Sequence, residues 1–261
     1  KGCLVFLIDQ SGSMSDPCGI DATRSKAQML ADALNRLLAT TVTRCTGELG
    51  RPARDYFDIA VIGYGSNAGV GPAFQGSLRG REWATVPEIE SGTIRIDERM
   101  KQVDDGAGGL VETRRPLPVW IDPVAENGNP PMCAGLEAVR NLLRVWVQSH
   151  PANFPPIVFH ITNGHGDDGD PSPLLSTILE IGTDDGRVLL GHFVVSEGGE
   201  ALRLPGRWIR RQGTDGPLTY VVEESDRGQV LAGAWDALDI FFLSGRANPG
   251  LGGRVIHVTQ R

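Results

Sequence analysis

An acidic residue followed by two closely spaced serines is the strongest chemical signal in the sequence. Asp9 ends the apolar run Cys3–Asp9, and the turn that follows reads Asp9-Gln10-Ser11-Gly12-Ser13-Met14-Ser15. A carboxylate and two hydroxyls on a glycine-containing turn can point three oxygens at one place. Hard divalent cations such as Mg²⁺ and Ca²⁺ prefer oxygen ligands of this kind. The same residues also suit a different role, as an acidic N-cap and a serine-rich loop before a helix.

This turn resembles the Asp-x-Ser-x-Ser signature of von Willebrand factor A domains. The later motifs follow in an order similar to that of the family. A long helix and a second strand come next, then a Gly/Pro loop that opens a helix at 127–136, then a strand that ends in Thr162-Asn163-Gly164. The resemblance implies a metal-ion-dependent adhesion site. In the family this site takes the acid and both serines from the first loop, a threonine from a second loop and an aspartate from a third.

Two departures from the family pattern fall on this site. The second loop reads Gly128-Asn129-Pro130-Pro131-Met132 where the family has Gly-Gly-Thr-Pro-Met, so Pro130 stands at the threonine position and offers no side-chain oxygen. Two alternatives stay open: the neighbouring Asn129 supplies a carbonyl oxygen, or the register of this loop against the family pattern is shifted. Asn163 replaces the aspartate of the third loop and brings no negative charge. Since cation affinity follows ligand charge and number, we predict a weakened site for Mg²⁺, or for Ca²⁺ or Mn²⁺. Its predicted ligands are Asp9, Ser11, Ser13 and Asn163; the alternative is a hydrogen-bonded loop junction without metal.

A second set of potential ligands lies near the same three loops. Cys18 follows the first loop, Cys133 the second and His165 the third. Two cysteines and a histidine can bind Zn²⁺, and a cysteine pair can act as a redox switch. The alternative is that Cys133 opens a helix and packs into it as a small apolar side chain.

The resemblance implies a binding module that is not an enzyme. In such a domain the cation keeps an open coordination position, which an Asp or Glu side chain of a protein partner completes. The segments 117–120, 130–136 and 160–164 are similar to those of intracellular bacterial members of the tellurium-resistance type. This implies a cytoplasmic adaptor in a signalling, stress or defence assembly, with a kinase, a phosphatase or an ATPase as partner.

Two other functions stay open at this point. One is a metal-dependent phosphatase or other hydrolase that uses the Asp9 loop, because dehalogenase-type phosphatases also carry an acid after the first strand. Those enzymes need a second aspartate two residues later, where this chain has Ser11. The chain also lacks a Gly-x-Ser-x-Gly nucleophile elbow. The other alternative is a structural domain with a dead metal site.

Apolar strands alternate with amphipathic helices along the chain. This order predicts an α/β fold with a doubly wound, Rossmann-like and mostly parallel sheet between helices. The resemblance described above implies that this sheet is of the von Willebrand factor A type. We expect one domain over residues 1–261. The predicted strands are Cys3–Asp9, Asp58–Ser66, Pro156–Thr162, Val188–Ser196 and Arg254–Val258; the predicted helices are one with an apolar stripe from Ala27 to Leu38, and Ala134–Gln148, Ser172–Ile181 and Gln229–Ser244.

Two stretches fit this alternation poorly. Residues 67–118 show no helical stripe, and the period-2 piece Glu88–Ile96 favours a strand, so we expect an antiparallel edge strand and a long hairpin excursion. Residues 198–224 are predicted to form a second hairpin region, with Leu218–Val222 as its best strand. The acidic turns around Asp167, Asp168 and Asp170 are expected to be solvated, and His160 is expected to be a hydrogen-bonded core residue.

Charge and composition exclude some partners. The 25 Lys and Arg residues against 32 Asp and Glu residues give a net charge of −7, which disfavours nucleic acid and anionic membrane as partners. One basic cluster stands out, formed by Arg203, Arg207, Arg210 and Arg211 around Trp208; it is either a surface hairpin or a partner-binding patch. The four cysteines suggest free thiols in a reducing cytoplasm. The chain begins without Met, and we expect it to be a domain of a longer protein.

Overall fold

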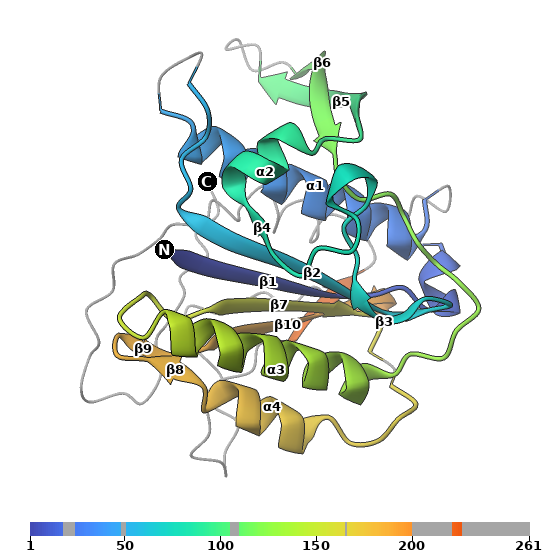
Figure 1. Cartoon of the computed structure of the whole chain (residues 1–261). Helices are drawn as coiled ribbons and strands as arrows, with labels where there is room; N and C mark the ends of the chain where they lie inside the picture. The colour runs from blue at the N-terminus through green and yellow to red at the C-terminus, as the bar shows by residue number, and fades with distance from the viewer. Residues whose placement is uncertain (18–23, 48–50, 105–109, 165, 200–220, 226–261) are drawn as a thin grey trace.

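Within the residues that the structure describes, seven strands form a mostly parallel sheet with helices on both faces (Figure 1). The computed structural model describes residues 1–17, 24–47, 51–104, 110–164, 166–199 and 221–225. The strands of the sheet are β1 (Gly2–Asp9), β2 (Phe57–Ser66), β3 (Gly69–Pro72), β4 (Ala84–Thr85), β7 (Ile157–Thr162), β10 (Leu189–Gly199) and β11 (Val221–Ser225). The helices are α1 (Lys26–Cys45), α2 (Val86–Ser91), α3 (Met132–Ser149) and α4 (Ser172–Leu179), with 3-10 turns η1 (Gly12–Ser15) and η2 (Gly76–Leu78). Two small sheets pair β5 (Arg95–Asp104) with β6 (Leu110–Val119) and β8 (Gly182–Thr183) with β9 (Gly186–Arg187).

The strand order places β1 at the centre of the sheet. The order is β11-β10-β7-β1-β2-β3, and β4 also pairs with β2. β1 runs parallel to both β2 and β7, while β3 and β4 are antiparallel to β2. The chain therefore extends the sheet from β1 toward one edge and then, from β7 on, toward the other. The predicted mixed α/β fold, with a mostly parallel central sheet, flanking helices and an antiparallel edge strand, is confirmed at this level.

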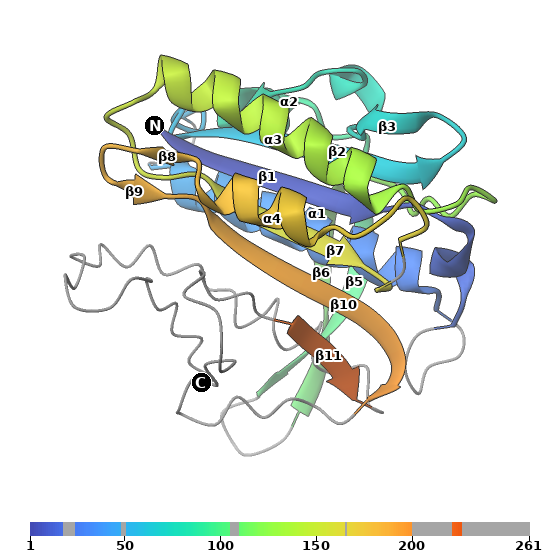
Figure 2. The same ribbon diagram turned by 90° about the horizontal axis from the view of Figure 1, so that it is seen from below.

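The side chains of β1 divide the core into two layers. Phe6 and Ile8 pack in a cluster with α1 and α2, whereas Val5 and Leu7 pack in a second cluster with α3 and α4. Figure 2 shows α3 and α4 on the face of the sheet opposite to α1. A strand covered on both faces needs apolar side chains at every position, which explains the uninterrupted apolar run of β1.

One predicted strand is wrong. We expected an extended segment over Glu88–Ile96, but the structure forms the short helix α2 over Val86–Ser91. Thr85 and Glu88 form a capping box at its start, and Pro87 occupies the first turn. The Thr-x-x-Glu pattern with an early proline is a helix-start signal. The capping box and the proline therefore favour a helix here, although the residues that follow have the period-2 pattern of a strand.

A long hairpin occupies the end of the predicted 67–118 excursion. β5 and β6 pair antiparallel and lie outside the layers of the main sheet, beyond α1 (Figures 1 and 2). Pro116 lies opposite Glu98, and Pro118 lies opposite Ile96. Because proline has no N–H to donate, non-hydrogen-bonded pairs suit both prolines, which restricts the register of the hairpin.

Most of the second predicted hairpin region, 198–224, lies outside the described residues, so this hairpin stays a prediction. β11 contains the end of the predicted strand Leu218–Val222, and it pairs parallel to β10. Residues 201–220, with the arginine cluster Arg203, Arg207, Arg210 and Arg211, lie outside the described residues. The predicted helix Gln229–Ser244 and strand Arg254–Val258 lie outside them as well.

None of the described helices combines the length and the apolar character that crossing a bilayer requires.

We expect Leu34→Ala in α1 and Leu143→Ala in α3 each to lower the free energy of unfolding by about 2–5 kcal/mol. Both leucines have no exposed surface, and they belong to the two opposite core clusters, as their spacing on the helices predicts. Urea denaturation of the purified chain measures the change. Val145→Ala is the matched control, because Val145 is 64% exposed and its loss should cost less than about 0.5 kcal/mol. A loss below about 1 kcal/mol for either leucine would contradict the two-layer core.

Candidate cation site at the carboxyl ends of β1 and β7

The two central strands β1 and β7 end side by side at the carboxyl end of the sheet, at the point where the strand order reverses. Asp9 is the last residue of β1, and Thr162 is the last residue of β7. The parallel register aligns Ile8 with Ile161, so Asp9 and Thr162 emerge next to each other. In open α/β sheets, ligands bind in the crevice at such a switch point, outside the carboxyl ends of the strands.

The four predicted ligands lie in one hydrogen-bonded cluster at this edge. The Ser11 amide donates to Asp9 Oδ1 over 2.9 Å, which folds the turn back on the carboxylate. The hydroxyls of Ser11 and Ser13 are 3.2 Å apart. The Asn163 side-chain amide, from the third loop, donates to Ser13 Oγ. The structure thus brings together all four residues, while their role as metal ligands stays a prediction.

The carboxylate of Asp9 is buried without a cationic partner in the part of the chain that the structure describes. Asp9 is 1% exposed, and its Oδ2 accepts a hydrogen bond from the Thr162 hydroxyl over 3.2 Å. No described Lys or Arg side chain forms an ion pair with it. Burial of an ionised carboxylate costs several kcal/mol unless hydrogen bonds or a counter-ion compensate it. The geometry therefore places a stabilised negative charge at the junction of the loops.

Two glycines allow the loops to approach so closely. Gly65, next to the last residue of β2, has a φ of 83°, and a Cβ there would lie 2.9 Å from the Ser11 side chain. A Cβ on Gly128 would lie 2.3 Å from the carbonyl oxygen of Gly65. Any larger residue at either position would push the first or the second loop away from the cluster.

Backbone hydrogen bonds attach the second loop to the first and third. The Glu126 amide donates to the Gln10 carbonyl over 3.0 Å. The Asp167 amide donates to the Pro130 carbonyl over 3.2 Å. Pro130 is buried, so the residue at the family's threonine position joins the second loop to the third through its backbone. The predicted register of Pro130 against the family pattern stays a prediction.

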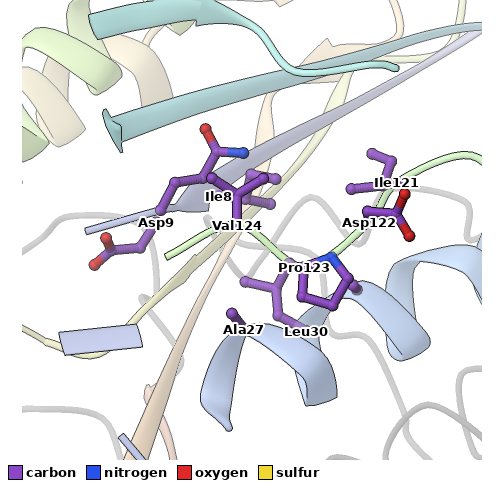
Figure 3. Close-up of a pocket in the computed structure, with 10 residues that line it drawn as sticks. Ile8, Asp9, Ala27, Leu30, Ile121, Asp122, Pro123 and Val124 are labelled. Carbon is purple, nitrogen blue, oxygen red and sulfur yellow. The ribbon is translucent and has the colours of Figure 1, made fainter. Parts of the chain in front are cut away.

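A small cavity lies behind the cluster, between the end of β1, α1 and the segment Ile121–Val124 (Figure 3). Its volume is about 10 Å³, close to the minimum that holds one water molecule. Figure 3 shows the carboxylates of Asp9 and Asp122 at opposite sides of this lining, pointing away from each other. The cavity therefore has room for a water molecule but not for a substrate.

The third loop also caps α3. Asp168 accepts hydrogen bonds from the amides of Cys133 and Ala134, over 2.9 and 2.8 Å, at the first turn of the helix. Pro131, at the N-cap position, makes no side-chain cap. Burial alone would raise the pKa of Asp168, but the two amide donors outweigh it and lower the pKa below its ordinary value. Asp168 is exposed, as expected of a solvated acidic turn, and it caps α3 in addition.

The second predicted site is described only in part. Cys18 and His165 lie outside the described residues, so the zinc or redox site stays a prediction. Cys133 is a free thiol in the first turn of α3. Burial and the nearby charge of Asp168 raise its pKa, which disfavours the thiolate that binds zinc. Within the described residues, no group of three or more His, Cys, Asp or Glu side chains is placed to hold a metal ion. The cluster at Asp9 differs from such groups because most of its donors are hydroxyl and amide oxygens.

Sequence reasoning missed the polar residues that lie beneath the cluster. Thr162 contacts Asp9 directly, although it entered the prediction only as part of the Thr-Asn-Gly motif. Tyr64 is fully buried, and its hydroxyl lies 3.0 Å from His160 Nε2, which confirms the expected hydrogen-bonded core role of His160. The signal for Thr162 was available, since a polar residue at the end of a buried strand needs a partner.

Comparison with known proteins assigns no family to this arrangement. No family model matches the chain, and no curated protein matches it. The functional argument therefore depends on the geometry of the three loops and on their motifs.

Two substitutions of Asp168 should separate the contribution of its helix cap to stability from the contribution of its charge. We expect Asp168→Asn, which keeps one acceptor oxygen, to destabilise the chain less than Asp168→Ala, which should cost about 0.5–2 kcal/mol. Since the folded pKa is lowered, this contribution is present above the unfolded value of about 3.8 and is lost as the pH falls through the folded pKa. The measurement is urea unfolding of each variant at neutral and at acidic pH.

Asp167→Ala serves as the control, because Asp167 is hydrogen-bonded to the second loop through its backbone amide, which the substitution keeps. An Asp168→Ala variant as stable as the Asp167→Ala variant at neutral pH would show that the cap contributes nothing.

Proposed function

We propose that this chain is a binding module of the von Willebrand factor A type. In this proposal, a divalent cation held by Asp9, Ser11, Ser13 and Asn163 binds an acidic side chain of a protein partner. The observation that carries the proposal is the cluster itself at the switch point of the sheet. In it the buried Asp9 carboxylate accepts from the Ser11 backbone amide. The Ser11 and Ser13 hydroxyls contact each other, and Ser13 also contacts the Asn163 amide.

The spacing of the oxygens supports a small, hard cation. Oxygen ligands at about 2.1 Å from one octahedral ion lie roughly 3 Å apart when they are neighbours. The Ser11 and Ser13 hydroxyls are 3.2 Å apart, which is compatible with neighbouring positions on one ion. Oxygen and nitrogen of an amide are assigned from the hydrogen-bond network, so a flip of the Asn163 side chain brings its Oδ1 to the same place. The donor set then consists of oxygens, as Mg²⁺, Mn²⁺ and Ca²⁺ prefer.

The charge of the cluster explains why the partner should be acidic. Asp9 is the single carboxylate among the four proposed ligands, so a bound divalent cation keeps a net positive charge. In the absence of a partner, such an ion binds the chain weakly, and it attracts a further carboxylate. Cation and partner then bind cooperatively, and each raises the affinity of the other by the same factor.

Titration of Mg²⁺ and Mn²⁺ into the chain by calorimetry tests the proposal. We expect the wild type to bind at about millimolar concentration or more weakly. Asn163→Asp should bind about tenfold tighter or more, because a charge near the ion is worth more than the roughly 1.4 kcal/mol that a tenfold change requires. Acetate, the smallest carboxylate probe, should raise the Mg²⁺ affinity of the wild type.

Asp9→Asn is the matched negative control, since it removes the charge with little change in shape, and it should abolish binding. Tight binding by the wild type, or no gain in Asn163→Asp, would contradict the proposed ligand set. An assay with a generic aryl phosphate runs in parallel. Mg²⁺-dependent turnover that Asp9→Asn abolishes would replace the binding module with a phosphatase.

A further inference from the structure

The hydroxyl of Thr162 joins the carboxylate of the candidate site to the third loop. Thr162 is fully buried at the end of β7, and its hydroxyl donates to Asp9 Oδ2 over 3.2 Å. The Gly164 amide donates to the same hydroxyl oxygen over 3.1 Å. The two directions are consistent, because an ionised carboxylate can only accept, whereas a hydroxyl donates its one proton and still accepts. One oxygen atom therefore serves both contacts.

The contact with Gly164 also restricts the place of Asn163. It closes a turn in which a threonine hydroxyl accepts from the backbone amide two residues later. Asn163 is the middle residue of this turn, and its side chain reaches Ser13 Oγ. Since the turn restricts the backbone on both sides of Asn163, it limits the positions that the Asn163 side chain can take.

These contacts form a closed ring at the proposed cation site. The Ser11 amide donates to Asp9, and the Ser11 hydroxyl contacts that of Ser13. The Asn163 side chain donates to Ser13. Thr162, which directly precedes Asn163 in the chain, donates to Asp9 and closes the ring. The other members of the ring are the proposed ligands, so Thr162 links the charged ligand of the first loop to the neutral ligand of the third.

We propose that Thr162 is a positioning residue of the cation site, which acts on the ion by holding the Asp9 carboxylate and the Asn163 side chain in place. This inference rests on the proposed function, because the ion is the one proposed at Asp9. Without the hydroxyl, the buried carboxylate loses a donor, and the turn that carries Asn163 loses its closing bond. A single substitution should therefore disturb both ligands.

Amide hydrogen exchange of the metal-free chain, followed for each residue by NMR, tests the positioning without any ion. In the wild type the Gly164 amide should be protected although the residue is exposed, because it donates to Thr162. Thr162→Val keeps nearly the same shape without the hydroxyl. It should make the Gly164 amide, and the Ser11 amide that contacts Asp9, exchange about threefold to tenfold faster. This factor corresponds to the loss of about one hydrogen bond.

Calorimetric titration of Mg²⁺ into the whole chain measures the consequence for the ion. The titrations use the Asn163→Asp background, where binding is expected to be tighter. There Thr162→Val should weaken Mg²⁺ binding about 10–100-fold, as is typical of a residue that orients a metal ligand.

Two variants separate positioning from a general loss of structure. Thr162→Ser keeps the hydroxyl and should retain both the Mg²⁺ affinity and the slow exchange of the two amides. Thr41→Val removes a buried hydroxyl from α1, where Thr41 donates to the Leu37 carbonyl, and it should change neither.

The outcomes distinguish this inference from the proposed function. Weaker Mg²⁺ binding by Thr162→Val with unchanged exchange at Ser11 and Gly164 would make Thr162 a direct ligand and overturn its positioning role. Equal Mg²⁺ affinity with and without the substitution overturns that role as well. So does an unprotected Gly164 amide in the wild type, a measurement that needs no variant and decides the point even if Thr162→Val does not fold. If neither wild type nor Asn163→Asp binds Mg²⁺ or Mn²⁺, the proposed function fails, and the exchange rates alone decide whether Thr162 holds Asp9 and Asn163 in place.

Discussion

One carboxylate, that of Asp9, is buried at the carboxyl end of the central strand β1, and the arrangement of the loops around it depends on this burial. Asp9 is removed from water, and in the described part of the chain it receives only neutral donors, the Ser11 amide and the Thr162 hydroxyl. A charge in that position is tolerated only while the donors stay in place. The turn after β1, the end of β7 and the glycines that let the loops close are therefore parts of one arrangement.

The sequence predicts the parts of this arrangement that are local. Asp9, Ser11 and Ser13 come together because a short turn joins them directly after a buried strand. Their separation along the chain is small, so spacing alone indicates that they converge. The spacing of residues could not predict that Asn163 joins them, since Asn163 meets Ser13 only through the parallel pairing of β7 with β1. The order of the motifs, and not the spacing, predicted that contact.

The remaining contacts depend on pairings between distant segments. Tyr64 and His160 are 96 residues apart, and nothing near either residue specifies the other. Their contact follows from the registers of β2 and β7 on the two sides of β1. The cap on α3 has the same origin, because Asp168 comes from a loop that no local helix-start pattern includes. The helix α2, by contrast, was missed although its capping box is local, because the period-2 pattern was given more weight.

The position of the acidic charge in the third loop accounts for the character of the proposed cation site. The loop carries an amide at Asn163, beside Ser13, and one of its carboxylates, that of Asp168, accepts from the first turn of α3. A carboxylate that accepts two helix amides is compensated by the positive end of the helix dipole. Its charge therefore stabilises the junction of the second and third loops. The third loop thus uses this carboxylate to hold α3 and the two loops together. In the proposed function, the further charge that holds a cation tightly comes from the partner.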